Sequence, residues 1–151
     1  MSKDIAIGMF STSDKKSVLD LLSRAELPIE DLTDEKMEHF IVAKNSDGYV
    51  IGVVGIEIHN ESGLLRSLVV RLPYRDKGLG RRLVGKIESY AQYNGIKTLY
   101  LLTMTAADFF PKIGFEMTLR DKVPDSIRKT EEFKYVCPIS AACLYKVLDV
   151  A

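Results

Sequence analysis

The sequence has few of the features that mark secreted, membrane or metal-binding proteins. It has no tryptophan and only two cysteines, Cys137 and Cys143, which form no CxxC pair. The two histidines and these cysteines do not fall at metal-ligand spacing, so we expect no metal site. Free thiols are typical of a reducing compartment, and no run of about 18 apolar residues occurs. These absences predict a cytoplasmic protein with no membrane partner.

An excess of one charge is also absent. The chain carries 21 basic and 21 acidic residues, so its net charge is zero. Non-specific binding to nucleic acid requires a basic surface, so we expect no nucleic-acid partner. The 151 residues are 46% hydrophobic, which is enough to build one buried core. No repeat or linker divides the sequence, and residues 1–151 are expected to form a single domain.

Hydrophobic patterning predicts a mixed α/β domain. Apolar residues alternate in some segments and recur at helical spacing in others. The expected strands are residues 5–9, 40–43, 49–58, 64–72, 96–103, 115–120 and 142–150. The expected helices are residues 18–25, 80–94 and 106–113, with a helix or turn within 30–38 and an irregular segment at 122–134. The central strand, helix and strand are typical of a buried βαβ unit.

The segment that enters the helix at 80–94 predicts a binding site for an anion. It reads Arg75-Asp76-Lys77-Gly78-Leu79-Gly80 and continues with two further arginines. Glycines at a strand-to-helix turn let the backbone approach a phosphate closely. The first turn of a helix adds unpaired N–H groups and a partial positive charge. The simplest ligand is a pyrophosphate on the N–H groups of residues 77–81.

Two common phosphate-binding loops do not fit this segment. A dinucleotide-binding turn needs G-x-G-x-x-G, but only Gly78-x-Gly80 is present. A P-loop needs G-x-x-x-x-G-K-[ST], which the sequence lacks. A solvated basic turn without a ligand remains as an alternative. The spacing that fits is R-x-x-G-x-G.

Arg75-x-x-Gly78-x-Gly80 after a strand resembles the coenzyme A signature of the GNAT N-acetyltransferases. The resemblance extends over nearly the whole chain and includes Phe109-Phe110-x-x-x-Gly114-Phe115, similar to that family's late helix and following turn. It implies a central mixed, mostly antiparallel sheet of six to seven strands, splayed at a central V, with about four helices. It also implies acetyl-CoA as cosubstrate, no metal, and direct acetyl transfer to an amine.

A narrower resemblance concerns the acceptor. Residues 63–70, 101–110 and 132–141 look like the GNAT proteins of arsenic-resistance operons. The stretch from Leu102 to Phe109 is also similar to the acetyltransferase domain of N-acetylglutamate synthases. Both imply a small, amino-acid-like acceptor; a peptide or protein N-acetyltransferase and a non-catalytic acyl-CoA-binding sensor remain as alternatives. Homodimers are common in the family, although no residue here requires one.

The resemblance assigns most site residues to the cofactor. The pantetheine arm would pair with the backbone of the strand at 64–72, and the pyrophosphate with the loop. The expected cofactor-binding residues are Leu68, Val69, Val70, Arg75, Asp76, Lys77, Gly78, Leu79, Gly80, Arg81, Thr103, Phe109 and Phe110. Many family members have a tyrosine at the position of Phe110 that protonates the thiolate. Here Tyr135, Tyr145, water or no acid at all would take its place.

Two charged residues interrupt apolar strands and are the candidates for catalysis. Glu57 is the expected base for the acceptor amine; its alternative is an exposed charge near a strand end. Arg66 is expected to hold an acceptor carboxylate, because a charge in an apolar strand is costly unless paired and guanidinium binds carboxylate bidentately. A surface-facing arginine is the alternative. Thr105 and Cys137 are further candidate acceptor contacts, with helix capping and a buried structural thiol as alternatives.

Overall fold

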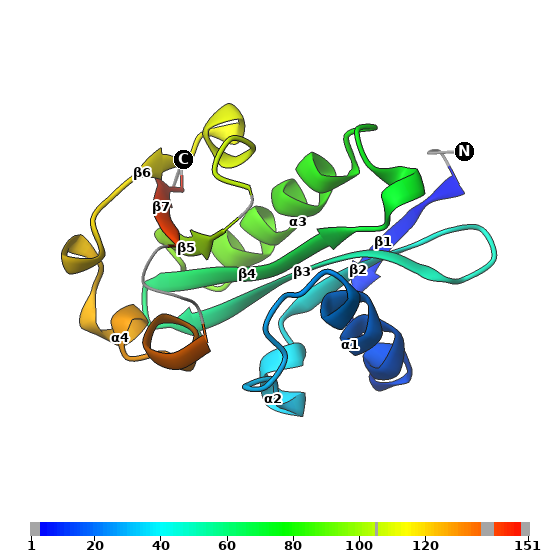
Figure 1. Ribbon diagram of the computed structural model, residues 1–151, viewed down its shortest axis with the longest axis horizontal. Coiled ribbons are helices and arrows are strands. Elements are labelled where there is room, and N and C mark those ends of the chain that lie inside the picture. The colour runs from blue at the N-terminus through cyan, green and yellow to red at the C-terminus, as the bar shows by residue number, and fades with distance from the viewer. Residues whose placement is uncertain (1–3, 105, 137–140, 149–151) are drawn as a thin grey trace.

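A computed structural model describes residues 4–104, 106–136 and 141–148 (Figure 1). Within these ranges the strands form one seven-stranded sheet in the order β1-β2-β3-β4-β5-β7-β6. Every neighbouring pair is antiparallel except β4 and β5, which run parallel. The predicted mixed, mostly antiparallel sheet is therefore confirmed.

The elements follow one another closely along the chain. The strands are β1 (Ala6–Met9), β2 (Phe40–Lys44), β3 (Val50–His59), β4 (Ser62–Val70), β5 (Thr98–Thr103), β6 (Glu116–Met117) and β7 (Ala142–Val147). The α-helices are α1 (Lys15–Arg24), α2 (Asp34–Met37), α3 (Leu79–Tyr93) and α4 (Asp125–Arg128). Because α3 connects the parallel strands β4 and β5, the predicted βαβ unit is confirmed. Within the described ranges, no helix is both long and apolar enough to cross a membrane.

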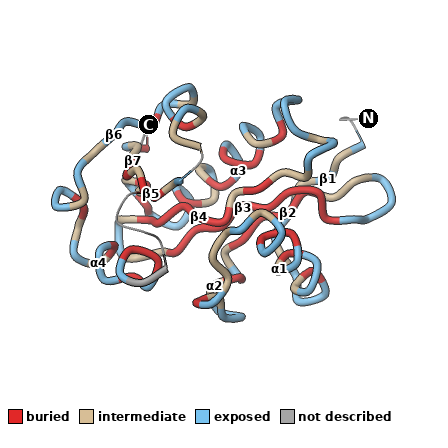
Figure 2. The backbone as a smooth tube through the Cα atoms, in the orientation of Figure 1, coloured by how far each residue is buried: buried red, intermediate tan, exposed pale blue. Residues whose placement is uncertain are grey.

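Helices cover both faces of the sheet (Figure 1). On one face, Leu83 and Ile87 of α3 belong to the same buried cluster as Ile41 of β2. On the other face, Leu22 of α1 belongs to a second cluster with Val42. The two β2 residues separate in this way because successive side chains of a strand point to opposite faces. The sheet between the helices is buried over most of its length (Figure 2).

Three segments differ from the sequence-based expectation. The helix expected at 106–113 is only a 3-10 turn, Phe110–Ile113. Pro111 lacks a backbone donor and its ring obstructs a continuous α-helix, and Gly114 ends the turn with left-handed backbone (φ 99°). The strand expected at 115–120 is reduced to β6. The segment expected to be irregular contains α4 and the start of a short π-helix, Glu132–Val136.

Candidate active site

β4 and β5 separate soon after they meet. Their parallel pairing joins Ser62–Leu64 of β4 to Thr98–Tyr100 of β5. β4 then continues to Val70, and in the described part of the chain it has no further pairing with β5. The strands thus open into the predicted V, and one backbone edge of β4 faces the opening.

A bulge bends β4 inside the V. Gly55 of β3 lies opposite Arg66, whereas Val53 lies opposite Val69, so two steps along β3 match three along β4. Ser67 lies in the extra step with left-handed backbone (φ 60°), which is uncommon for a residue other than glycine. Bulges redirect neighbouring groups and are frequent beside active sites. This one directly precedes the stretch predicted to bind pantetheine.

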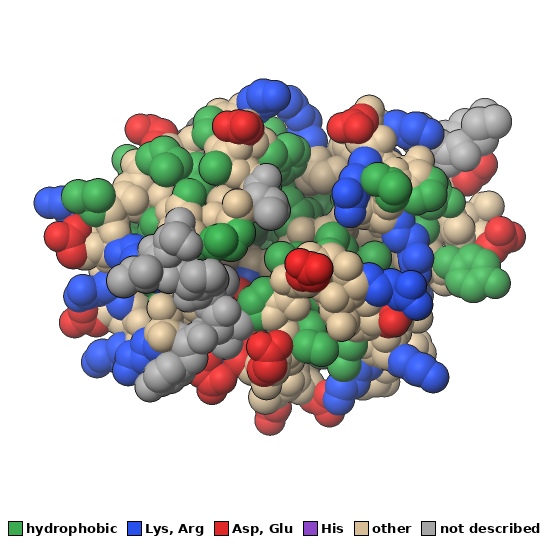
Figure 3. Space-filling view, viewed as in Figure 1, with side chains coloured by type: hydrophobic (Ala, Val, Ile, Leu, Met, Phe, Trp, Pro, Cys, Tyr) green, Lys and Arg blue, Asp and Glu red, His purple; other side chains and the backbone are tan. Residues whose placement is uncertain are grey.

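The loop before α3 has the geometry of an anion-binding site. Asp76 (φ 63°) and Gly78 (φ 85°) have left-handed backbone, and Gly78 is the N-cap of α3. Among the described residues no side chain caps this helix end, so its first N–H groups are available to a ligand. Such turns at helix N-termini attract anions. Lys and Arg side chains gather on this part of the surface, over the end of β4 and the beginning of α3 (Figure 3).

A pocket of about 530 Å³ lies beside this loop and the open edge of β4, and we call it the loop pocket. The predicted cofactor residues that line it are Leu68, Val69, Val70, Arg75, Asp76, Gly78, Gly80 and Phe109. Lys77 and Arg81 are exposed, and Leu79 is buried in the core. The structure therefore brings most of the predicted cofactor residues together around one cavity.

A second pocket of about 450 Å³, which we call the inner pocket, adjoins the loop pocket. The two cavities share the lining residues Ala25, Leu27, Leu68 and Ala106. The inner pocket extends from the connection after α1, across β4 and β5, to Glu132. A molecule in the loop pocket would therefore meet a molecule in the inner pocket near the middle of the V.

Two more of the predicted cofactor residues line the inner pocket. Thr103 lines it, and its Oγ1 accepts a hydrogen bond from Ala106 N at 2.9 Å. This bond holds the turn that follows β5. Phe110 is buried and also lines this pocket. Thr105 and Cys137 lie outside the described residues, so their predicted acceptor contacts stay predictions.

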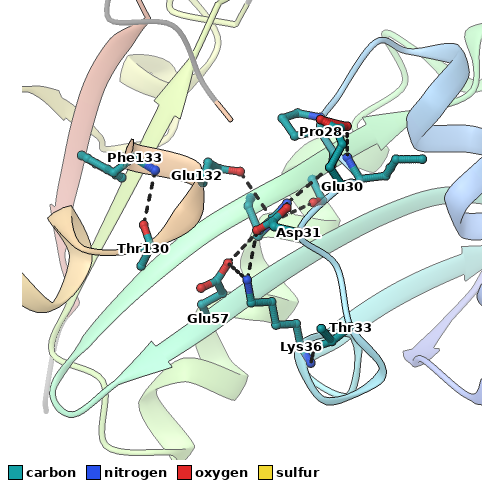
Figure 4. A network of polar contacts seen from close by, with 12 residues as sticks. Pro28, Glu30, Asp31, Thr33, Lys36, Glu57, Thr130, Glu132 and Phe133 are labelled. Carbon is teal, nitrogen blue, oxygen red and sulfur yellow. Dashed lines mark hydrogen bonds and ion pairs between the residues drawn. The ribbon is translucent and has the colours of Figure 1, made fainter. Parts of the chain in front are cut away.

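The inner pocket borders a buried cluster of charges drawn from four parts of the chain (Figure 4). Arg66 donates to Asp31 through Nη1 at 2.5 Å and Nη2 at 2.9 Å, and to Glu57 Oε2 at 2.7 Å. Its Nε donates to Ser67 Oγ at 3.1 Å and lies 3.5 Å from Glu132 Oε1. The side chains of the arginine and the three carboxylates are at most 6% exposed. Burial makes the loss of one charge costly, because its partners then remain unpaired.

Every N–H group of the Arg66 guanidinium faces an acceptor within the described structure. Besides the contacts above, Nη2 donates to Pro28 O at 3.4 Å, which accounts for all five hydrogens. Burial opposes the charge, but the hydrogen bond with Asp31 and the charges of Glu132 and Asp31 hold the pKa of Arg66 above its ordinary value. Arg66 is therefore not a surface arginine. An acceptor carboxylate could reach it only by displacing a present partner, and that role stays a prediction.

Glu57, the predicted base, is held in place by positive and donor groups. Its Oε1 lies 3.3 Å from His59 Nε2, and Lys36 Nζ lies 3.9 Å from its Oε2. Burial alone would raise the pKa of Glu57, but hydrogen bonds with His59 and Arg66 and the charges of Arg66 and Lys36 lower it overall. Glu57 lines neither the loop pocket nor the inner pocket. The geometry therefore does not favour Glu57 as the group that accepts a proton.

Glu132 has a different environment. It lines the inner pocket, and its contact within the cluster is the ion pair with Arg66. Burial raises the pKa of Glu132 to about 7; the charges of Glu57 and Asp31 add to this rise, and those of Arg66 and Lys36 oppose it. A carboxyl with such a pKa exchanges protons near neutral pH.

We expect Glu132 to make the folded state less stable as the pH rises from about 4.5 to about 7. Below this range both states are protonated; within it the unfolded state loses the proton while the folded state keeps it. Glu132→Gln, which stays neutral, should remove this loss. Chemical denaturation of wild type and variant across the range measures the difference. Glu131→Gln, a change at the exposed neighbour, should behave like wild type; parallel curves for all three proteins would contradict the raised pKa.

Sequence reasoning missed two of the three carboxylates in this cluster. Asp31 stands in a segment with Glu30, Asp34 and Glu35, and composition alone does not show which carboxylate faces inward. Glu132 lies in a stretch expected to be irregular. The available signal was the arginine within an apolar strand, which requires an anionic partner when buried. The sequence does not indicate which segment supplies that partner.

The model of the "Acetyltransferase (GNAT) domain" matches residues 36–117, which is more than half of the chain and includes the loop before α3. The chain belongs to the GNAT acetyltransferase family. The family predicted from Arg75-x-x-Gly78-x-Gly80 is therefore confirmed, while the narrower resemblance to arsenic-resistance proteins stays a prediction.

Several sequence relatives are named amino-acid acetyltransferases. One from Pseudomonas syringae pv. syringae is 42% identical over 67 residues, which are 44% of this chain and 16% of that protein. Another from Pseudomonas fluorescens is 29% identical over 119 residues, which are 74% of this chain and 27% of that protein. The chain thus matches less than a third of the length of these relatives.

Solved structures show the same fold. N-acetylglutamate synthase from Neisseria gonorrhoeae, complexed with coenzyme A and N-acetyl-glutamate, has a TM-score of 0.84 at 20% identity over 96% of this chain and 35% of that one. Rv2747 from Mycobacterium tuberculosis, in complex with CoA, has a TM-score of 0.81 at 21% identity over 95% of this chain and 99% of that one. At these identities the likeness establishes the fold.

Proposed function

We propose that this chain is an N-acetyltransferase that moves the acetyl group of acetyl-CoA to the amine of a small, amino-acid-like acceptor. The observation that carries the proposal is the continuity of the two pockets. The loop pocket lies at an anion-binding helix terminus, and the inner pocket reaches a buried carboxyl group. A cofactor in the first would present its acetyl group to an acceptor in the second.

The loop pocket fits coenzyme A by its chemistry. The pyrophosphate would bind the N–H groups of residues 77–81 at the start of α3. Arg75 Nε donates to Val70 O at 2.7 Å, which fixes the loop against the end of β4. The pantetheine arm carries amides, and it would pair with the open backbone edge of β4 as an added strand does. Two solved relatives of this fold contain coenzyme A, which supports this assignment.

The inner pocket suits a small acceptor. Its volume of about 450 Å³ lies within the range of small-molecule sites. Relatives of this chain are named amino-acid acetyltransferases, which supports an amino-acid-like amine. The amine nitrogen would attack the thioester carbonyl carbon, the C–N bond would form, and the C–S bond would break. Backbone N–H groups along the β4 edge would stabilise the oxyanion.

Among the side chains that the structure describes, neither Phe110 nor Tyr145 is placed to protonate the leaving thiolate, and the side chain of Tyr135 lies outside them. Phe110 has no proton to donate, and Tyr145 stacks on Tyr100 with ring centroids 6.5 Å apart and lines neither the loop pocket nor the inner pocket. A thiol ionises near about pH 8.5, so the thiolate is a tolerable leaving group and solvent would protonate it.

We expect coenzyme A thiol to be released from acetyl-CoA when an amino acid is added. A panel of amino acids, simple amines and short peptides, followed with a chromogenic disulfide, measures turnover, and calorimetry measures coenzyme A binding. Rates about tenfold higher with an amino acid than with any peptide would support the proposal. Fastest turnover with peptides would support a peptide acetyltransferase, and tight binding without turnover would support a sensor. Absence of coenzyme A binding would overturn the whole assignment.

A further inference from the structure

Glu132 is the carboxylate of the buried cluster that faces a cavity. It lines the inner pocket, whereas Asp31 and Glu57 do not line that pocket and bind Arg66 from the other sides. Asp31 accepts hydrogen bonds from two nitrogens of Arg66 and Glu57 from one, at 2.5 to 2.9 Å. Glu132 lies 3.5 Å from Nε, whose hydrogen bond goes to Ser67. Arg66 therefore binds Asp31 and Glu57 more closely than Glu132.

The nearby positive groups balance the negative charge of Glu132 less well than those of Asp31 and Glu57. The groups that act on it are Arg66 from β4, Glu57 from β3, Asp31 from the connection before α2, and Lys36 from α2. Lys36 Nζ lies 3.1 Å from Asp31 Oδ2 and 3.9 Å from Glu57 Oε2. Both positive groups thus lie nearer the other two carboxylates. The cluster contains three carboxyl groups and two cations. Of the three carboxyl groups, Glu132 is the one that can pair with a cationic group bound in the inner pocket.

The backbone holds Glu132 in this position. Thr130 is buried; its Oγ1 donates to Ile127 O at 2.7 Å and accepts from Phe133 N at 3.4 Å (Figure 4). Lys134 N donates to Thr130 O at 3.0 Å. These bonds fix the turn on either side of Glu132. The carboxyl group is thereby directed toward Arg66 and the pocket.

An amine acceptor supplies both a positive charge that could pair with Glu132 and a proton that Glu132 could remove. At neutral pH it enters as an ammonium ion, which cannot attack a carbonyl carbon until it loses a proton. Building on the proposed acetyl transfer, we propose that Glu132 is the general base that removes this proton. Asp31 and Glu57 are then positioning residues that hold Arg66 beside it.

The protons and bonds balance without a further reactant. The ammonium group gives one proton to the Glu132 carboxylate, and the resulting amine attacks the thioester carbon. The C–N bond forms, the C–S bond breaks, and its electron pair leaves with sulfur. The second proton on nitrogen leaves to solvent, and solvent protonates the thiolate to give coenzyme A. Glu132 releases its proton to water before the next turnover.

A merely structural Glu132 would give a different result from a base. If it only balances the charge of Arg66, its replacement should alter folding or acceptor affinity but leave the pH profile of turnover unchanged. If it is the base, turnover of wild type should fall as the pH drops through about 7, because the carboxylate becomes protonated. The pH profile of kcat/KM therefore separates the two roles.

We expect Glu132→Gln to lower kcat by about 100-fold or more, which is the usual size of a general-base contribution. The same change should abolish the fall of turnover near pH 7. Glu132→Asp keeps a carboxylate on a shorter stem, so it should restore part of kcat and regain a pH limb. Glu131→Gln, an equal change at the exposed neighbour, should match wild type. Calorimetry with coenzyme A should give the same affinity for all four proteins.

If Glu132→Gln kept the kcat of wild type and the same fall of turnover near pH 7, the inference would be overturned. The proposed function would stay intact, because both proteins would still transfer the acetyl group. Equal losses of kcat in Glu132→Gln and Glu132→Asp, with unchanged pH limbs, would assign Glu132 a structural role. Failure of the proposed function would look different, because wild type itself would then release no thiol with any amine.

Discussion

Gly80→Asp is expected to weaken coenzyme A binding by about 100-fold or more while leaving the fold intact. Gly80 lines the loop pocket in the first turn of α3, where the pyrophosphate would lie. The new carboxylate would occupy that space and repel the phosphates. An acidic residue in the first turn of a helix is favourable, so the thermal midpoint should stay level or rise. Calorimetry with coenzyme A and a thermal denaturation curve measure the two effects separately.

Two matched variants define the cause of that loss. Gly80→Ala adds only a Cβ, whose nearest neighbour would be Phe109 Cζ at an ordinary 3.5 Å, so it should lower affinity far less. Gly85→Asp places the same charge in the same helix at an exposed position with open space, and should bind like wild type. Pantetheine, which lacks the phosphates, should bind wild type and Gly80→Asp alike. Unchanged coenzyme A affinity in Gly80→Asp would refute the loop assignment.

Arg66→Ala should be the most destabilising single change in the charge cluster. It leaves the carboxylates of Asp31 and Glu57 buried without the partner that binds them at 2.5 to 2.9 Å. Breaking one side of a buried ion pair costs about 3–5 kcal/mol. Burial raises the pKa of Asp31 and Glu57, but Arg66, helped by Lys36 and for Glu57 by His59, holds both below their ordinary values. Removal of Arg66 therefore lets both carboxylates take up protons more readily in the folded state. The loss of stability should therefore shrink as the pH falls toward 4.

The control for this variant is Arg24→Ala. Arg24 forms an exposed pair with Asp20 on α1, and exposed pairs contribute little, so its denaturation midpoint should stay near wild type. Denaturation at pH 7 and near pH 4 measures the pH dependence. A stable Arg66→Ala protein with unchanged coenzyme A affinity and a raised acceptor KM would instead show that Arg66 binds an acceptor carboxylate.

Most of the fold could be predicted from the sequence because its signals are local. The alternation around Ile41 and Val42, and the helical spacing of Leu83 and Ile87, depend only on which side of an element each residue faces. The segment around Pro111 differs from the prediction because its apolar spacing favours a helix, whereas Pro111 disrupts one. The π-helix that begins at Glu132 has no comparable sequence signature.

The cofactor side of the site was predictable for the same reason, whereas the acceptor side was not. Gly78 and Gly80 act within one continuous loop, and backbone geometry there follows from residue type. The inner pocket combines residues from 25 to 132 of the chain. Arg66 could be recognised as a charge that needs a partner, but its partners come from segments brought near it only by tertiary folding.

The short contact between β4 and β5 makes the sheet almost two sheets. Three residue pairs connect the four-stranded half to the three-stranded half in the described structure, and each half is antiparallel within itself. A ligand that pairs with the β4 edge would occupy the opening between β4 and β5 and would connect the two halves while it is bound. At a concentration 100 times its Kd, such a ligand adds about 2.7 kcal/mol to the free energy of unfolding. The resistance of the protein to heat would then depend on the cell's supply of cofactor as well as on its own sequence.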